Sequence, residues 1–337
     1  MALVTNTVPD YRREPFRLLD EAEDVEVIAW ADIGQRAAIG RLAAGDHRAV
    51  IAGLGGRAVL PAAYAIARHR AVPFLLWASL WDHPRTLAHR LSWRPTRALY
   101  RRADAIVTYG PHVDRYVSRI RGTTAGVFDA PQSVDVAHFA RPVPDEDRAT
   151  ARARAGARRE DFLLVYVGRL VPEKGIATLL AAWREAGLDH AALAFAGQGP
   201  ERPPNALGPV AKADLPALYA AADALVLPSL RTATFTEPWG LVVNEAMLQG
   251  TPVITSDAVG AAAGGLVRPG RNGLVVPPGD ARALAGAIRR LAGDPEGRRR
   301  LGAAARHDAG AYTPSAWVRG MRDALAAVGA GRQEPRC

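Results

Sequence analysis

Short apolar runs and amphipathic stretches alternate along the first 140 residues. The apolar runs favour buried strands, and the stretches between them repeat apolar residues at helical spacing. This alternation predicts an α/β domain with a doubly wound parallel sheet. The predicted strands are residues 1–8, 24–31, 47–54, 71–79, 104–110 and 124–132, and the predicted helices are residues 14–22, 37–45, 58–70, 95–103 and 111–121.

The second half of the chain repeats this plan. A charged, Pro/Ala-rich stretch without a strand pattern, residues 140–159, separates the halves and predicts a domain boundary. We therefore expect two Rossmann-like domains, residues 1–145 and 155–311, that face a cleft and bind ligands at the carboxyl ends of their strands. The predicted strands are residues 162–168, 192–197, 224–229, 252–257 and 273–276, and the predicted helices are residues 175–187, 213–222, 239–249 and 280–294.

Composition narrows the class of protein. The hydrophobic content of 49% is ordinary for a globular protein, and no apolar run is long enough for a transmembrane helix. No signal-peptide pattern opens the chain, and Cys337 is the single cysteine, so we expect a reducing, cytoplasmic setting.

The net charge of +9 indicates either an anionic partner or a codon bias towards arginine. Lysine occurs only at Lys174 and Lys212, which makes a lysine in a loop more informative than an arginine. Residues 89–103 are the densest basic patch. This patch is consistent with an anionic or lipid-linked acceptor, with peripheral contact at the inner membrane face, or with a solvated helix.

Two glutamates flank the start of the predicted helix 239–249. Pro238 suits a first helical turn and Gly250 a helix end, so Glu237 and Glu245 should lie roughly 12 Å apart at about 1.5 Å per residue. The free amides of the helix N-terminus between them can bind a phosphate. The alternative is that Glu237 only complements the helix dipole and Glu245 is solvated.

Two further loops follow predicted strands of the second half. Arg169 and Lys174 come after the strand that ends at Gly168, and two such cations can neutralise a diphosphate leaving group without a metal. Exposed loop charges are the alternative. A second loop, at Gly197, is glycine-rich, as expected where the backbone approaches a ligand or turns sharply.

The order of these motifs resembles the GT-B glycosyltransferases of the large retaining family 4, also called glycosyl transferases group 1. The resemblance is most specific over residues 155–300 and looser over the N-terminal half. It implies that Arg169 and Lys174 bind the diphosphate of a nucleotide sugar, that Glu237 binds hydroxyls of the transferred sugar, and that Glu245 binds the ribose. It also implies donor contacts from further residues: Gly168, Gly197, Val210 at the nucleobase, Pro238, Trp239, and the backbone of Gly240 and Leu241.

The first domain departs from the family pattern in three places. Residues 7–16 replace the usual Gly-Gly loop with a bulky basic segment, which shifts this loop towards acceptor binding by Tyr11 and Arg12. The usual Asn-Gly-Val-Asp is Gln-Ser-Val-Asp at residues 132–135. The family's active-site histidine has a partial match in His83, next to the acceptor candidate Trp81; a loop histidine satisfied by its neighbours is the alternative.

Metal and cofactor motifs are missing from the sequence. The acidic run at residues 145–147 lies in the predicted linker, so we expect transfer without a metal and without a cofactor besides the UDP- or GDP-sugar donor. The acceptor is expected to be a sugar, a lipid-linked molecule or a small molecule. The competing hypotheses are a nucleotide-sugar epimerase or hydrolase, and a basic nucleic-acid- or membrane-binding protein, although no nucleic-acid partner is favoured.

The chain's last predicted helix, within residues 313–330, carries an apolar stripe. Trp317, Met321, Leu325 and Val328 recur at helical spacing and need a partner surface. The resemblance implies that this helix crosses back to the N-terminal domain, whereas packing on the second domain is the alternative.

Overall fold

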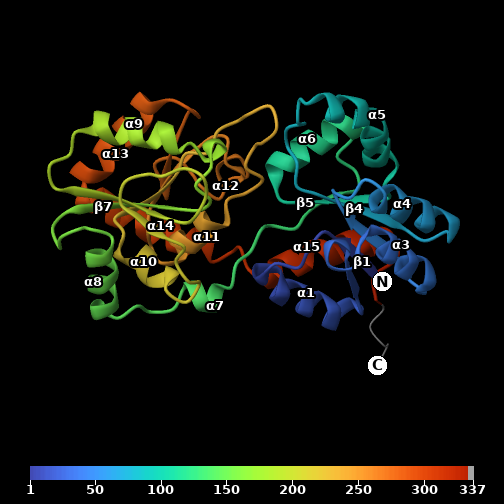
Figure 1. Cartoon of the computed structure of the whole chain (residues 1–337). Coiled ribbons are helices and arrows are strands. Elements are labelled where there is room, and N and C mark those ends of the chain that lie inside the picture. Colours follow the sequence, from blue (N-terminus) through green and yellow to red (C-terminus); the bar gives the residue numbers. More distant parts are fainter. Residues whose placement is uncertain (333–337) are drawn as a thin grey trace. The chain divides into compact units, whose positions relative to one another are not determined.

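A computed structural model describes residues 1–332. In it the chain forms two compact units (Figure 1). Unit 1 comprises Met1–Ser133 together with the segment that starts at Tyr312, and unit 2 comprises Val134–Ala311. The division therefore precedes residues 140–159, the stretch that we expected to be the linker. Cys337 lies outside the described residues.

Unit 1 is built on a six-stranded parallel sheet with the order β2-β1-β3-β4-β5-β6. Strands at its centre, such as β4, are buried along their whole length, as parallel strands covered on both faces must be. The strands are β1 (Ala2–Thr5), β2 (Glu26–Ala29), β3 (Val50–Gly53), β4 (Phe74–Ala78), β5 (Ala105–Thr108) and β6 (Val127–Asp129).

Helices cover both faces of this sheet and form two apolar cores. One core includes residues of α3, α4 and α6, and the other includes residues of α1 and α15. The helices are α1 (Asp10–Glu23), α2 (Trp30–Ile33), α3 (Gln35–Ala44), α4 (Val59–His69), α5 (Leu87–Arg102), α6 (Pro111–Arg121) and α15 (Pro314–Ala327).

Two helices of unit 1 begin earlier than predicted. Helix α1 starts at Asp10, so most of the segment that we interpreted as a loop is helical, with Pro9 at the N-cap and an acid in the first turn. Helix α5 starts at Leu87, eight residues before Pro95, because Thr86 caps it by accepting a hydrogen bond from the amide of His89. In both cases a proline inside the helix misled the boundary prediction.

The last helix, α15, packs within unit 1, which confirms the prediction that it crosses back. Trp317, Met321 and Leu325 are fully buried in the core that also contains Phe16 and Trp77. The helix also approaches β6 closely: a Cβ at Gly320 would lie 1.9 Å from the carbonyl oxygen of Asp129. The apolar stripe therefore finds its partner surface in the first sheet.

Unit 2 contains a second six-stranded parallel sheet, with the order β12-β11-β10-β7-β8-β9. Its strands are β7 (Phe162–Val167), β8 (Ala191–Ala196), β9 (Ala206–Gly208), β10 (Ala224–Leu227), β11 (Val253–Ser256) and β12 (Gly273–Val276). Its helices are α7 (Val136–Phe139), α8 (Asp145–Arg154), the 3₁₀ turn η1 (Pro172–Lys174), α9 (Ile176–Ala186), α10 (Leu215–Ala221), α11 (Leu241–Leu248), α12 (Gly260–Ala263), α13 (Ala281–Gly293) and α14 (Pro295–Ala309).

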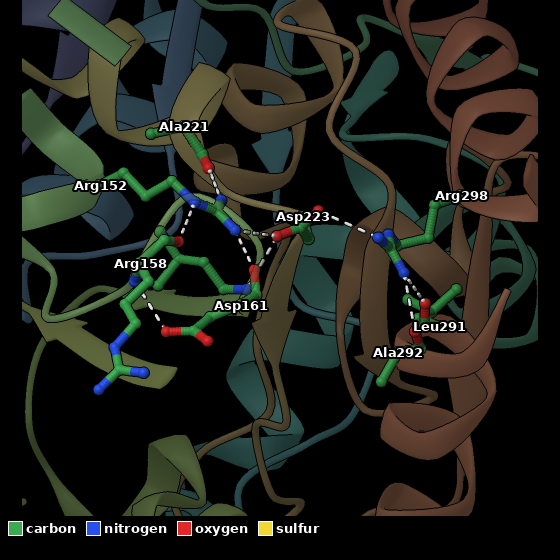
Figure 2. Close-up of polar contacts among 9 residues, drawn as sticks. Arg152, Arg158, Asp161, Ala221, Asp223, Leu291, Ala292 and Arg298 are labelled. Carbon is green, nitrogen blue, oxygen red and sulfur yellow. Dashed lines mark hydrogen bonds and ion pairs between the residues drawn. The ribbon is translucent and has the colours of Figure 1, made fainter. Parts of the chain in front are cut away.

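A polar cluster fastens α8 and α14 to the start of β10 (Figure 2). Asp223, the residue before β10, accepts hydrogen bonds from Arg152 at 3.0 Å and from the amide of Leu163 at 2.8 Å. Its other carboxylate oxygen lies 3.3 Å from Arg298 of α14. The stretch that we expected to be a linker is thus anchored in unit 2, at the amino ends of the strands.

The sequence prediction missed β9, α8, α14 and the short helices α2, α7 and α12. Helix α14 carries a recognisable start signal, because Asp294 accepts a hydrogen bond from the amide of Gly297 and Pro295 occupies the first turn. No helix within residues 1–332 combines the length and apolar character needed to cross a bilayer.

Candidate functional site

The first candidate loop lies at the carboxyl end of β7. Gly168 follows the strand with a φ of 150°, and the side chain of Arg169 is 62% exposed beside Glu173. Lys174 ends the short turn η1 and is only 9% exposed. Gly175 allows this turn to approach β10, because a Cβ there would lie 2.1 Å from the carbonyl oxygen of Pro228. The loop thus directs one cation to solvent and one into the protein.

Lys174 forms a buried ion pair with Glu237. The same carboxylate oxygen of Glu237 accepts a hydrogen bond from the hydroxyl of Ser229 at 3.1 Å, and Ser229 is fully buried. Phe235 covers the ammonium group, with its ring centroid 5.2 Å from Nζ. Because β7 and β10 are neighbours in the sheet, the loops that follow them bring Lys174 and Ser229 to one edge.

Glu237 lies before the helix, as predicted, but the helix starts two residues later than we expected. Helix α11 begins at Leu241, and Gly240 at its N-cap has a φ of 92° that favours glycine. Glu237 instead pairs with Val259 in an isolated parallel bridge. Pro238 consequently precedes the helix rather than occupying its first turn. The segment from Glu237 to Gly240 is not part of the helix, so the predicted separation of the two glutamates stays a prediction.

Glu245 is on α11 and is half-buried. The hydroxyl of Tyr219 donates a hydrogen bond of 2.6 Å to its carboxylate. Burial raises the pKa of Glu245 to about 7, while the Tyr219 hydrogen bond and the charge of Lys212 act in the opposite direction. Burial, together with the negative charge of Glu245, raises the pKa of Tyr219 well above its usual value. Glu245 therefore changes charge near neutral pH.

Among the remaining predicted donor residues of unit 2, Gly197, Trp239 and Leu241 lie next to these groups, whereas Val210 lines a separate cavity. Gly197 follows β8, and a Cβ there would lie 1.8 Å from the carbonyl oxygen of Gly168, so the two loops are in backbone contact. Trp239 is buried, and its indole N–H donates to the side-chain oxygen of Asn244 at 2.7 Å. Leu241 is the first residue of α11. Val210 lies apart from the ion pair, in a cavity of about 270 Å³ between α8 and α10.

Arg12 of unit 1, which we predicted to bind the acceptor, is buried. The residue is 2% exposed, and its guanidinium donates a hydrogen bond to the side-chain oxygen of Gln132. Four aromatic rings surround the guanidinium at 4.6–5.5 Å, those of Tyr11, Trp77, Tyr109 and Trp317. Arg13, by contrast, is exposed and pairs with Asp10. Arg12 thus holds an aromatic cluster together, and Tyr11, its neighbour on α1, is half-buried.

Trp81 and His83 follow β4 in the loop that precedes α5. The ring of Trp81 packs on His112 at 5.3 Å, and that of His83 packs on Trp93 at 4.4 Å. The Nε2 atom of His83 lies 3.1 Å from the carbonyl oxygen of His89. His83 is therefore held by its own loop and by α5, as the loop-histidine alternative expects, and its role as an active-site residue stays a prediction.

Several polar residues at the sheet edges were not predicted. Ser229 and Tyr219 orient the two glutamates, and nothing in a single serine or tyrosine signals such a role. In unit 1 the hydroxyl of Thr108 lies 2.5 Å from Asp114 and 3.0 Å from Asp129. Burial and the contact with Asp129 raise the pKa of Asp114 to about 7.

Within residues 1–332 we find no group of three or more His, Cys, Asp or Glu side chains that could hold a metal ion.

Comparison with known proteins relates unit 2 to a family. Residues 161–294 match the family described as glycosyl transferases group 1. A D-inositol 3-phosphate glycosyltransferase from a Nocardioides species is 33% identical over 251 residues, which cover 62% of this chain and 51% of that protein. A glycogen synthase from Mycobacterium tuberculosis is 31% identical over 225 residues, covering 62% of this chain and 50% of that protein. The chain thus spans about half the length of these curated relatives.

The fold is similar to solved structures over nearly the whole chain. The crystal structure of Anabaena Alr3699/HepE in complex with UDP and glucose aligns with a TM-score of 0.74 and 19% identity, covering 97% of this chain and 99% of that one. This similarity shows the GT-B fold.

Proposed function

Since residues 161–294 belong to the glycosyl transferases group 1 family, we propose that this chain moves a sugar from a UDP- or GDP-sugar to a hydroxyl acceptor. The observation that carries the proposal is the buried Lys174–Glu237 pair at the edge of the second sheet. A cation and a sugar-binding carboxylate in contact suit a ligand whose diphosphate and sugar are joined. Support for the donor class comes from the Anabaena protein, whose crystals contain UDP and glucose.

In the proposed reaction, the bond between the anomeric carbon and the diphosphate breaks, and the nucleoside diphosphate leaves with the electron pair. The acceptor oxygen bonds to the same face of that carbon, and its proton passes to the departing diphosphate. Arg169 and Lys174 stabilise the negative charge that grows on the diphosphate, with help from the free amides at the start of α11. Glu237 accepts hydrogen bonds from sugar hydroxyls, and Glu245 accepts them from the ribose.

The proposed transfer retains the anomeric configuration and needs no divalent metal. Its acceptor is proposed to contact Tyr11, Trp81 and His83 of unit 1, because aromatic rings suit the faces of sugars or flat aglycones. Arg12 is not included among the residues that touch the acceptor, since its guanidinium is enclosed by aromatic rings.

The experiment that tests the proposal screens nucleotide sugars for thermal stabilisation, hydrolysis and transfer, with and without EDTA. The anomeric configuration of the product is read by NMR. With the nucleotide sugar that is turned over, Arg169→Ala is expected to lower kcat by a factor on the order of 10²–10³, because one cation that stabilises the developing charge is lost. Arg184→Ala removes an exposed arginine of α9 and is the matched control. Near wild-type turnover by Arg169→Ala would place the donor elsewhere.

Lys174 requires a second variant, because its removal leaves Glu237 as a buried, uncompensated charge. Lys174→Met alone is expected to lower the free energy of unfolding by about 3–5 kcal/mol. Lys174→Met combined with Glu237→Gln removes both charges and is expected to recover most of this stability while turnover stays lost. A double variant that regains both stability and turnover would contradict the catalytic assignment of the pair.

A further inference from the structure

Helix α5 of unit 1 exposes two large apolar side chains. Leu87 and Leu91 are 72% and 75% exposed, and they stand four positions apart, one helical turn. A third exposed large apolar residue, Ile33, is on α2 and is 42% exposed. Leucines on adjacent turns lie on one face of the helix. Leu87 and Leu91, which we call the leucine step, therefore form one apolar patch that is exposed to water.

Arginines surround this step. Arg90, Arg94 and Arg97 are exposed and lie at spacings of four and three, so they form a row along one face of α5. Leu87, Leu91 and Arg94 follow the same spacing, which joins the leucine step to the arginine row. Helix α5 contains no acidic residue.

The nearby acids are already paired with other arginines. Asp82, before the helix, lies 3.9 Å from Arg85, and Asp104, after the helix, pairs with Arg68 of α4. Within residues 1–332, the side chains of Arg90, Arg94 and Arg97 make no ion pair. The row therefore presents an uncompensated positive charge.

The opposite face of α5 fixes the helix to unit 1. Tyr100 is 1% exposed in the core, and Trp93 packs against the same core and against His83. The helix lies beside α6 at the outside of the unit (Figure 1). Since the aromatic side is held by the protein, the leucines and arginines are held facing outwards.

We propose that α5 docks unit 1 onto the surface of an anionic lipid bilayer. The leucines enter the boundary between headgroups and acyl chains, and the arginines bind anionic headgroups, as in interfacial amphipathic helices. Charge complementarity selects an anionic partner, and the exposed leucines favour a bilayer over a nucleic acid, whose phosphate surface offers them no apolar environment. This inference is independent of the proposed transferase activity.

The test measures co-sedimentation of the full chain with vesicles at low ionic strength. We expect binding to an equimolar mixture of phosphatidylglycerol and phosphatidylcholine, no binding to phosphatidylcholine alone, and release by salt. Replacing Arg90, Arg94 and Arg97 with Gln is expected to weaken binding about a hundredfold, from the usual contribution of a basic residue near an anionic surface. Leu87→Ser with Leu91→Ser is expected to weaken it by about tenfold or more.

Matched controls separate this surface from the general positive charge. Arg282, Arg290 and Arg299 are exposed residues of α13 and α14, and their replacement with Gln removes the same charge elsewhere. Ile33→Ser removes the other exposed apolar residue. Both controls are expected to bind vesicles like the unmodified chain, and thermal melting checks that every variant is folded.

Three results would overturn the inference. The first is no binding to the anionic vesicles at low ionic strength. The second is an equal loss in the α5 arginine variant and in its control, which would show an unspecific charge effect. The third is a preference for mixed-sequence duplex DNA over vesicles that persists in the leucine variant, which would indicate a nucleic-acid surface.

Discussion

Glu237 and Glu245 have different surroundings although they stand close together in the sequence. Glu237 contacts a cation, Lys174, and a hydroxyl, Ser229. Glu245 instead contacts a neutral hydrogen-bond donor, Tyr219, and forms no ion pair with another side chain within residues 1–332. Because burial without a contacting cation disfavours the charged form, the pKa of Glu245 rises to about 7. The pH dependence of the free energy of unfolding of unit 2 should therefore reflect the titration of Glu245.

Glu245→Gln tests this pKa through stability. Since the pKa of Glu245 is higher in the folded than in the unfolded chain, the folded form keeps its proton between about pH 4.5 and 7 while the unfolded form loses it. The wild-type free energy of unfolding should therefore fall across this window, relative to Glu245→Gln, by roughly 3 kcal/mol and stay level above it. Urea unfolding of both proteins at several pH values measures the difference.

The charge of Asp114 affects both proteins equally, so it cancels in this comparison. Glu185→Gln, which removes an exposed carboxylate of α9, is the matched control. A difference between wild type and Glu245→Gln that does not change with pH would show that the Glu245 carboxyl has an ordinary pKa.

At the scale of elements, the position of α15 depends on a backbone contact. Gly320 lets the helix approach β6 so closely that a Cβ would lie 1.9 Å from a carbonyl oxygen. Backbone atoms cannot rotate away as a side chain can. The buried Trp317 and Met321 flank this contact on the same helix, so a shift there would disturb the core that they share with α1.

Gly320→Ala is therefore expected to destabilise unit 1, with a loss of about 1–3 kcal/mol, the usual range for overpacking. Gly286→Ala is the matched control, because Gly286 lies in α13 with open space around its Cβ position. Helix propensity predicts that this second change stabilises unit 2 by about 0.5–1 kcal/mol. Urea unfolding measures both. A neutral or stabilising Gly320→Ala would contradict the close packing of α15 on β6.

At the scale of the whole molecule, the chain forms two units with separate sheets and cores. All donor residues proposed here belong to unit 2, and α15 belongs to unit 1 although it follows unit 2 in sequence. A ligand that binds only one unit stabilises that unit by mass action.

UDP or GDP is accordingly expected to raise the melting temperature of unit 2 more than that of unit 1. At a hundred times its Kd, a nucleotide should add about 2.7 kcal/mol to the unit that binds it. Calorimetry resolves the transitions, and Gly320→Ala marks the one that belongs to unit 1. A nucleotide that shifts only the marked transition would move the donor site to unit 1.

Local patterns determined much of this fold. Strand–helix alternation predicted the two parallel sheets, because apolar periodicity depends on residues near each other in sequence. The motif order predicted which residues to examine in unit 2, including Lys174, Glu237 and Glu245. Helix boundaries near Pro15 and Pro95 were predicted less well, because proline inside a helix overrides the usual stop signal when capping and packing support the helix.

Only the tertiary structure decided what each charged residue contacts. Arg12 is enclosed by Trp77 and Trp317, which are far from each other in the sequence, and no local pattern predicts that neighbourhood. The pairing of Lys174 with Glu237 joins residues 63 positions apart. A charge is stabilised or penalised by groups within a few ångströms, and in a parallel sheet those groups come from loops that are distant in sequence.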